Sequence, residues 1–421
     1  MAATRREFLA RSAALAAGAA VLGPDLLRSA ARADSPSLAT RTLSDLARQS
    51  GRYFGTCASY GQITSDPSYA ALIAAQCDTL VPQNELKWAA LRPTPPPPGQ
   101  PDPSPVLTTT QADAIVSWAR SHNMRVRGSC FTWMNSNPWW FFQQTPRSTP
   151  VDAAFQTSDR GPAGPFINAD NALSRLEEHI TAVMGHFRGQ VTSWDVVNEA
   201  ILGGTGTAAY QPTPWAQWLG PRYIDAAFTI AHRVDPSAQL CIGEFNLEYT
   251  NHYSTARQDA MLRLLEGLLS RGVPVHAIGI EAHLSANAVQ SQFTEAHLRG
   301  FLRRLQSLGL SVIISEMDID DDGLPQDFTT RDRAVAEAYR RFLGAALSES
   351  VVEGVITWGL SDKYSWMNDG NDARFNRPYS SPVPVLHEQT NARPLPYDGN
   401  LAAKPARAAL AAAFASSPRR R

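Results

Sequence analysis

The sequence predicts a single (β/α)8 barrel, and three observations lead to this α/β fold class. Short apolar runs rich in β-branched residues alternate with longer helical stretches along the 421 residues, a pattern that predicts parallel strands joined by helical crossovers. Eight such runs occur, which is the number that closes a TIM barrel. Polar residues cluster just after the runs, where the active sites of such barrels lie. A doubly wound sheet would instead concentrate them near one switch point.

The predicted strands are apolar runs of four to eight residues, which is the length of a buried strand and too short for a helix. In chain order they are residues 53–58, 79–82, 125–132, 191–197, 239–242, 277–282, 311–315 and 354–357. The stretches between them are amphipathic or rich in Ala, Leu and Arg, which predicts helices. The clearest are residues 111–122, 172–187, 223–233, 256–271, 294–308 and 332–347.

Composition and charge limit the classes of partner. The chain is 43% hydrophobic and 18% charged, with a net charge of −1 and a pI of about 6.8. No broad electrostatic field favours nucleic acid or an anionic membrane, so we expect a small or neutral partner. The four cysteines have no metal-ligand spacing. They are interpreted as buried small hydrophobic residues, although a disulfide between any two stays possible.

The N-terminus has the pattern of an export signal. Thr4-Arg5-Arg6-Glu7-Phe8-Leu9 is a twin-arginine motif, and an apolar run over residues 13–23 follows it. The run is too short to span a membrane, and Ala31-Arg32-Ala33 offers a cleavage site. The alternative is an Arg/Ala-rich start that arose by chance. We predict a Tat signal over residues 1–33 and one catalytic barrel over residues 34–421, periplasmic or extracellular, with no membrane attachment after the signal is removed.

Two glutamates close apolar runs 117 positions apart, Glu199 in Trp194-Asp195-Val196-Val197-Asn198-Glu199 and Glu316 in Ser315-Glu316-Met317-Asp318. Glycoside cleavage needs one carboxyl group to protonate the leaving oxygen and a second one to attack or to activate water. A single strand-end glutamate is more often a surface residue or a salt-bridge partner. Two on the same barrel rim, each within a polar cluster, favour the catalytic interpretation.

Neighbouring residues suggest which glutamate has which role. Glu316 and Asp318 share a face of an extended strand, and His283 ends the preceding strand, so a chain from Asp318 through His283 to Glu316 would keep Glu316 ionised as a nucleophile. The alternative is a purely structural polar network. Glu199 follows a more apolar stretch, where desolvation would raise its pKa and suit an acid/base.

Other rim residues are candidates for sugar binding. Asn198 could donate its amide to a sugar hydroxyl, and the indoles of Trp133, Trp358 and Trp366 could stack on pyranose faces, although a tryptophan at a strand end is otherwise usually part of the core. The chain has only three lysines. Two of them, Lys87 and Lys363, fall within rim motifs, which suggests a need for an ammonium group there.

These motifs resemble those of glycoside hydrolase family 10, the β-1,4-xylanases and their relatives. The resemblance covers roughly residues 45–415. It is carried by Asn84-Glu85-Leu86-Lys87-Trp88, Arg127-Gly128, Trp133, Trp194-Asp195-Val196-Val197-Asn198-Glu199, Gly279-Ile280, His283-Leu284, Ser315-Glu316-Met317-Asp318, Trp358-Gly359-Leu360-Ser361-Asp362-Lys363-Tyr364-Ser365-Trp366 and Lys404-Pro405-Ala406.

The resemblance implies a retaining endo-β-1,4-glycanase that hydrolyses xylan, with Glu199 as acid/base and Glu316 as nucleophile. It also implies a set of residues on the glycone side of the scissile bond: Asn84, Lys87, Trp133, Asn198, His283, Trp358 and Trp366. Asp318 and Glu281 would support them. The resemblance implies no metal or organic cofactor. The expected partner is a polysaccharide or oligosaccharide, and a monomer is expected.

The sequence departs from the family pattern around the expected sugar site. Ser129 and Met134 stand where the family usually has histidines, Glu281 stands where it has glutamine, Gln83 replaces an acidic residue, and Gly243-Glu244-Phe245 replaces Asn-Asp-Tyr. If Glu281 lies near Glu316, the extra acid would raise the apparent pKa of one of these two carboxyl groups. Two alternatives therefore stay open: a related barrel hydrolase for another glycan or glycoside, and a sugar-binding protein that has lost turnover.

Overall fold

Parallel pairing runs through the central sheet of the computed structural model, which describes residues 38–94, 106–138, 170–202, 210–211, 213–368 and 391–420. The predicted signal, residues 1–33, lies outside this part of the chain, and Thr42–Arg421 forms one compact unit. Its strands are β1 (Tyr53–Ala58), β2 (Thr79–Pro82), β3 (Arg125–Thr132), β4 (Ser193–Asn198), β5 (Gln239–Glu244), β6 (Ala277–Ile280), β7 (His283–Ser285), β8 (Ser311–Asp320) and β9 (Val352–Thr357).

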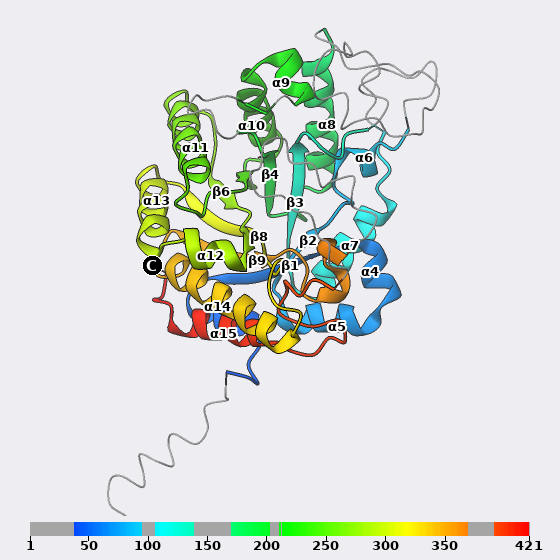
Figure 1. The fold of residues 1–421 in the computed structure, drawn as a ribbon. Coiled ribbons are helices and arrows are strands. Elements are labelled where there is room, and N and C mark those ends of the chain that lie inside the picture. Colours follow the sequence, from blue (N-terminus) through cyan, green and yellow to red (C-terminus); the bar gives the residue numbers. More distant parts are fainter. Residues whose placement is uncertain are drawn as a thin grey trace, which may run out of the picture. The chain divides into compact units, whose positions relative to one another are not determined.

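Eight of these strands close a barrel, which confirms the predicted fold class. Each of β1 to β5 pairs with the next, β6 pairs with β8, β8 with β9, and β9 with β1. The short strand β7 adds to the outer end of β8. Figure 1 shows the long helices of this unit around the outside of the strands.

The helices match the predicted ones within a few residues, and several short helices join them. They are α3 (Leu43–Gln49), α4 (Tyr60–Ser65), α5 (Pro67–Gln76), α6 (Trp88–Leu91), α7 (Thr110–Ser121), α8 (Ala172–His186), α9 (Pro214–Leu219), α10 (Arg222–Val234), α11 (His252–Ser270), α12 (Ala286–Gln292), α13 (Glu295–Ser307), α14 (Phe328–Ala346) and α15 (Pro405–Ser416). Among the described residues, no helix has both the length and the apolarity that crossing a membrane requires.

Side-chain caps explain where several of these helices begin. The Asn251 side chain accepts a hydrogen bond from the backbone N–H of Ser254 at 2.9 Å at the start of α11, and Asp327 accepts from Thr330 at 2.8 Å at the start of α14. Both satisfy backbone donors that a first helical turn leaves free. The short α4, which is not among the predicted helices, begins with a reciprocal capping box.

Three predicted strands are wrong at their outer ends. The fifth, 239–242, continues to Glu244 as β5. The sixth run, 277–282, ends as a strand at Ile280, because Ala282 takes a left-handed conformation with φ of 60° before β7 begins. The seventh, 311–315, continues to Asp320, because β7 offers it a partner: His283 pairs in register with Asp318. Glu316 and Asp318 therefore lie within β8 and not after it.

The barrel interior is filled by a small apolar cluster and one ion pair. The cluster comprises Tyr53, Cys57, Val81, Cys241, Ala277, Ile313 and Ile356, with Trp358 packed against it. Above it the buried Arg127 guanidinium bonds the Asp195 carboxylate and also donates to the Cys241 sulfur at 3.2 Å. All four cysteines are buried and free. The remaining core lies between the strands and the surrounding helices.

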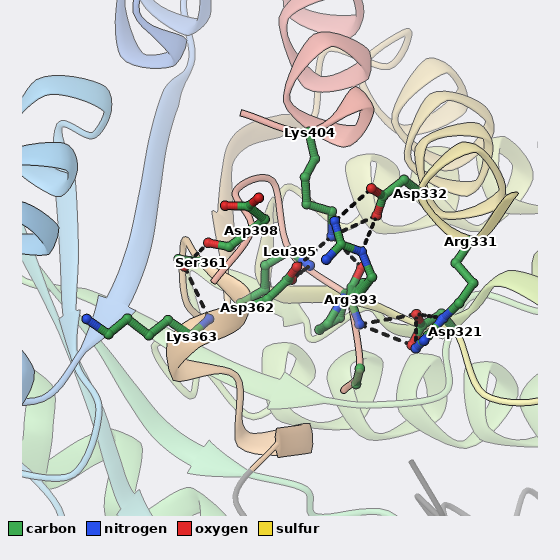
Figure 2. Close-up of polar contacts among 12 residues, drawn as sticks. Asp321, Arg331, Asp332, Ser361, Asp362, Lys363, Arg393, Leu395, Asp398 and Lys404 are labelled. Carbon is green, nitrogen blue, oxygen red and sulfur yellow. Dashed lines mark hydrogen bonds and ion pairs between the residues drawn. The ribbon is translucent and has the colours of Figure 1, made fainter. Parts of the chain in front are cut away.

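A second buried ion network joins the last strand–helix connection to α14, as Figure 2 shows. The Lys404 ammonium, 3% exposed, lies 2.8 Å from Asp362 and 3.4 Å from Asp332. Asp332 also pairs with Arg393 at 2.8 Å, and the second oxygen of Asp362 accepts from the backbone of Leu395. The network fixes the start of α15 against the 3-10 helix η3 (Asp362–Tyr364) that follows β9.

Candidate active site

The carboxyl ends of the strands carry the residues that the sequence analysis selected. The candidate set follows from the strand positions: Asn84 and Lys87 after β2, Trp133 after β3, Asn198 and Glu199 at the end of β4, Glu281 and His283 around β7, Glu316 and Asp318 in β8, Trp358 after β9, and Trp366 in the 3-10 helix η4 (Trp366–Asn368). Trp133, Trp358 and Trp366 are partly exposed. Their indoles are thus accessible from the same end of the barrel as both glutamates.

His283 lies at the centre of a chain of contacts between two carboxylates. Its Nδ1 is 2.9 Å from Oδ1 of Asp318, and its Nε2 is 3.4 Å from Oε2 of Glu316. The other Asp318 oxygen accepts a hydrogen bond from the Trp366 indole at 2.7 Å. Burial alone would lower the pKa of His283, but Asp318 and Glu316 outweigh it and raise this pKa well above its usual value. The imidazolium therefore lies beside the Glu316 side chain.

Glu199, in contrast to Glu316, is surrounded by groups that disfavour a negative charge. It follows β4 with φ of 51°, and its backbone N–H donates to the Gly243 carbonyl at 2.9 Å. The side chain is partly exposed, yet protein surrounds it on most sides. The pKa of Glu199 is raised to about 7. Burial is the largest cause, the nearby Trp133 indole opposes it without a hydrogen bond of normal geometry, and the charges of Glu244 and Glu316 add to the rise. Near neutral pH, Glu199 can therefore hold a proton.

A buried ion pair braces the turn that carries Glu199. The Glu244 carboxylate bonds the Arg257 guanidinium, and both side chains are fully buried. Glu244 also accepts from the backbone N–H of Ile201 at 2.9 Å, while Arg257 donates to the Ile201 carbonyl at 2.8 Å. The sequence analysis recognised Glu244 only as a departure from a motif and missed Arg257. No local signal connects a residue in the middle of α11 to this turn.

Lys87 connects the candidate sugar-binding residues. Its ammonium lies 3.3 Å from Oδ1 of Asn84 and over the rings of Trp133 and Trp358, at 5.0 and 5.8 Å from their centroids. The Lys87 side chain is mostly buried. A cation held between two partly exposed indoles and an amide can bond sugar hydroxyls while the rings offer apolar surface.

The profile of one family, glycosyl hydrolase family 10, matches residues 42–413 of the chain. This chain belongs to glycosyl hydrolase family 10. The resemblance inferred from the motifs is thereby confirmed. Among similar proteins, the beta-1,4-xylanase of Dictyoglomus thermophilum is 30% identical over 313 residues, which cover 71% of this chain and 75% of that protein.

Other family 10 relatives are much longer. The exoglucanase XynX of Acetivibrio thermocellus is 30% identical over 82% of this chain but only 27% of its own length, and the endo-1,4-beta-xylanase A of Thermoanaerobacterium saccharolyticum is 30% identical over 81% and 25%. The chain thus spans about a quarter of these two proteins. Among solved structures, xylanase 10B of Thermotoga maritima matches with a TM-score of 0.71 and 25% identity, covering 89% of this chain and 98% of the other.

Glu281 gives this family 10 chain a third carboxyl beside the pair. The backbone N–H of Glu316 donates to the Glu281 carbonyl at 3.0 Å, so the two residues are neighbours on adjacent backbone segments. The Glu281 side chain is 2% exposed, and its Oε2 lies 3.8 Å from Nε2 of His283. Burial raises the pKa of Glu281 well above its usual value, and the charges of Glu199 and Glu316 add to the effect.

Two other sequence interpretations have different outcomes in the structure. Lys363 does not join the family 10 site: its ammonium bonds Asp66 at 2.6 Å, and the side chain is 44% exposed. It was wrongly grouped with Lys87, because both lie in motifs that follow a strand. Ser129 is buried in β3, and Met134 is partly exposed just after it. The imidazoles usual at these two positions are therefore absent from the strand end that carries Trp133.

Proposed function

We propose that this family 10 chain is a retaining endo-β-1,4-xylanase that cleaves xylan through a covalent glycosyl-enzyme intermediate. One observation carries the proposal: the two glutamates have opposite charge environments. Burial raises the pKa of Glu199 to about 7, while Glu316 lies 3.4 Å from the imidazole of His283, whose pKa is raised. An acid that keeps its proton and a carboxylate that stays ionised are the two groups this chemistry requires.

The proposed reaction has two displacements. In the first, a Glu316 oxygen attacks the anomeric carbon while Glu199 gives its proton to the departing glycosidic oxygen. In the second, Glu199 takes a proton from water, the water oxygen attacks the same carbon, and the bond to Glu316 breaks. Two inversions restore the β configuration. Asn84, Lys87 and Asn198 would bond sugar hydroxyls, and the three tryptophans would contact the sugar faces.

Known relatives support xylan as the substrate. Several relatives are named as xylanases, and xylanase 10B of Thermotoga petrophila, 25% identical with a TM-score of 0.71, was solved in complex with xylobiose. The departures at Ser129, Met134 and Glu281 leave a related β-glycan as the second candidate, because they alter donors beside the site. A monomer that needs only a soluble oligosaccharide partner is part of the proposal.

Proton NMR of xylohexaose hydrolysis tests the proposal. The first new reducing ends should have the β configuration, and an α product would exclude the two-step route. A parallel panel of xylan, arabinoxylan, mixed-linkage glucan, cellulose and aryl glycosides tests the substrate, with xylan expected to be hydrolysed fastest. Binding of xylo-oligosaccharides without any product would support a sugar-binding protein instead.

Export through the Tat route is proposed from the sequence of residues 1–33 alone. Replacing both Arg5 and Arg6 by lysine should keep the protein in the cytoplasm, since the twin arginines are what the export machinery reads. Fractionation of cells that express the full chain measures this directly. Equal export of the parent and the double variant would contradict the proposal.

A further inference from the structure

Three ligand-type atoms converge beside the proposed nucleophile. His283 Nε2 lies 3.4 Å from Oε2 of Glu316 and 3.8 Å from Oε2 of Glu281, and all three atoms lie within 4.8 Å of one another. The family pattern usually has glutamine at position 281, so the second carboxylate is a departure from that pattern. One imidazole and two carboxylates form a donor set that suits zinc and similar transition metals.

The spacing of these atoms suits a small divalent ion. Zinc bonds imidazole nitrogen and carboxylate oxygen at about 2.0–2.2 Å, so two ligands in a tetrahedral site lie roughly 3.3–3.5 Å apart. The distances from His283 to Glu316 and Glu281, 3.4 and 3.8 Å, are close to that separation. Small rotations of the two carboxylates would complete three corners and leave the fourth for water.

The surroundings of His283 have the form found around metal-binding histidines. Its Nδ1 faces Asp318 at 2.9 Å, and Asp318 is itself held by the Trp366 indole at 2.7 Å. A carboxylate on the far nitrogen fixes the ring and raises the basicity of the nitrogen that faces the metal. Here that nitrogen, Nε2, faces Glu281 and Glu316.

Glu281 supplies an independent sign that the site lacks a partner. Its side chain is 2% exposed, and no described residue donates a hydrogen bond to its buried Oε1. Its other oxygen faces His283 at 3.8 Å, beyond hydrogen-bond length. A buried carboxyl without a donor is costly unless a proton or a cation compensates it.

We propose that Glu281, His283 and Glu316 bind one zinc-class divalent ion, which displaces the proton from His283 Nε2 into solvent, and that the bound ion blocks hydrolysis. A metal on the Glu316 oxygen occupies the electron pair that would attack the anomeric carbon, so the ion acts as an inhibitor and not as a cofactor. Magnesium and calcium should bind much more weakly, because they prefer sites in which all ligands are oxygen atoms. The inhibition rests on the proposed hydrolase function, whereas the binding itself does not.

Calorimetric titration of the full enzyme with zinc chloride, in a buffer that does not bind metals, tests the site. One zinc should bind per chain, and Glu281→Gln should weaken binding at least about tenfold. The matched control is His186→Gln, which removes an exposed histidine–carboxylate pair in which Nε2 lies 2.6 Å from Asp113. This control should keep the parent affinity. Loss of binding in the control, or unchanged affinity in Glu281→Gln, would overturn the proposal.

Two further measurements keep the test decisive if Glu281→Gln folds poorly. Cobalt added to the unmodified enzyme should give visible absorption of the intensity typical of tetrahedral coordination, and a weak octahedral spectrum would contradict the site. Xylotetraose should displace the cobalt; an enzyme that hydrolyses xylotetraose without displacing it would contradict the overlap of the metal with the sugar site. Zinc should inhibit xylan hydrolysis in proportion to calorimetric occupancy. A chain that binds zinc at Glu281 but cleaves no glycan refutes the proposed function alone, and a xylanase that binds no zinc refutes the metal site alone.

Discussion

His283 and Asp318 face each other across the pairing of β7 with β8, with Nδ1 of the imidazole 2.9 Å from Oδ1 of the carboxylate. Three residues of strand are enough to set this register. It directs the other ring nitrogen to Glu316, which precedes Asp318 by two positions on the same face of β8. The orientation of the imidazole is therefore fixed by backbone pairing as well as by the ion pair.

Asp318→Asn should lower kcat by about 10–100-fold with a smaller change in KM, since the imidazole loses the charge that orients it and raises its pKa. The measurement is steady-state kinetics on xylohexaose together with a thermal unfolding curve. Trp366→Phe, which removes the donor to Asp318 and also reduces the aromatic surface proposed to contact the sugar, should have a milder effect on kcat. A variant Asp318→Asn with parent kcat would show that this contact is structural only.

The two glutamates should respond to azide with products of opposite configuration. Glu316→Ala should hydrolyse an activated aryl β-xylobioside about 10⁴-fold more slowly or worse, and azide should enter from the vacated face to give the α-azide. Glu199→Ala should still form the covalent intermediate with this substrate, so azide should give the β-azide. NMR of the isolated azides measures both. Exchanged configurations would reverse the assigned roles.

The pH dependence should report the proton on Glu199. Its pKa is raised to about 7, chiefly by burial, so the acid form persists up to neutral pH and is lost above it. We expect kcat/KM for xylohexaose to fall as pH rises beyond about 7. The dinitrophenolate group of a dinitrophenyl xylobioside departs without needing a proton. For this substrate, kcat/KM should therefore fall much less at alkaline pH. The same decline with both substrates would mean that another group is responsible.

Lys404→Met should destabilise the protein by about 3 kcal/mol at pH 8, because it leaves the buried Asp362 carboxylate without its ammonium partner. Burial raises the pKa of Asp362 to about 6, opposed by Lys404. Without the lysine, the pKa of Asp362 in the folded protein rises further above its value in the unfolded chain. The folded state then loses stability as the pH rises, because Asp362 must ionise while it is buried. The deficit should therefore be smaller at pH 5.

Urea unfolding at both pH values measures this deficit, with Arg340→Met as the matched control. Arg340 makes an exposed pair with Glu337, with the two side chains 62% and 52% exposed. Removing such a pair should cost less than about 1 kcal/mol. Equal costs for the two substitutions would show that the Lys404 network contributes no more than a surface contact.

The barrel could be predicted because its strands are short runs of β-branched residues in the sequence. The candidate site residues could be predicted because they follow those runs. The outer half of β8 could not be predicted, because Glu316-Met317-Asp318-Ile319-Asp320 alternates acids with apolar residues, and its pairing with β9 and β7 cannot be recognised in the local sequence. β7 itself is too short to show a period.

Partners distant in sequence explain the remaining errors. Lys87 and Lys363 look alike as polar residues after strands, yet Lys363 is bonded by Asp66, 297 positions away. The Arg257 guanidinium reaches the turn after Glu199 from a different helix. Such pairings depend on the three-dimensional arrangement of the barrel, and neither residue type nor spacing encodes them in one sequence.

The left-handed residue Ala282 separates β6 from β7, and the two strands have different structural roles. Ala277–Ile280 closes the barrel against β8, whereas His283–Ser285 pairs only with the outer end of that strand. Residues on the outer part can therefore change without opening the barrel. The backbone of Glu281, between the two parts, still bonds Glu244 and Glu316 on its two neighbours, so the charge of its side chain beside the nucleophile can differ while these backbone hydrogen bonds stay in place.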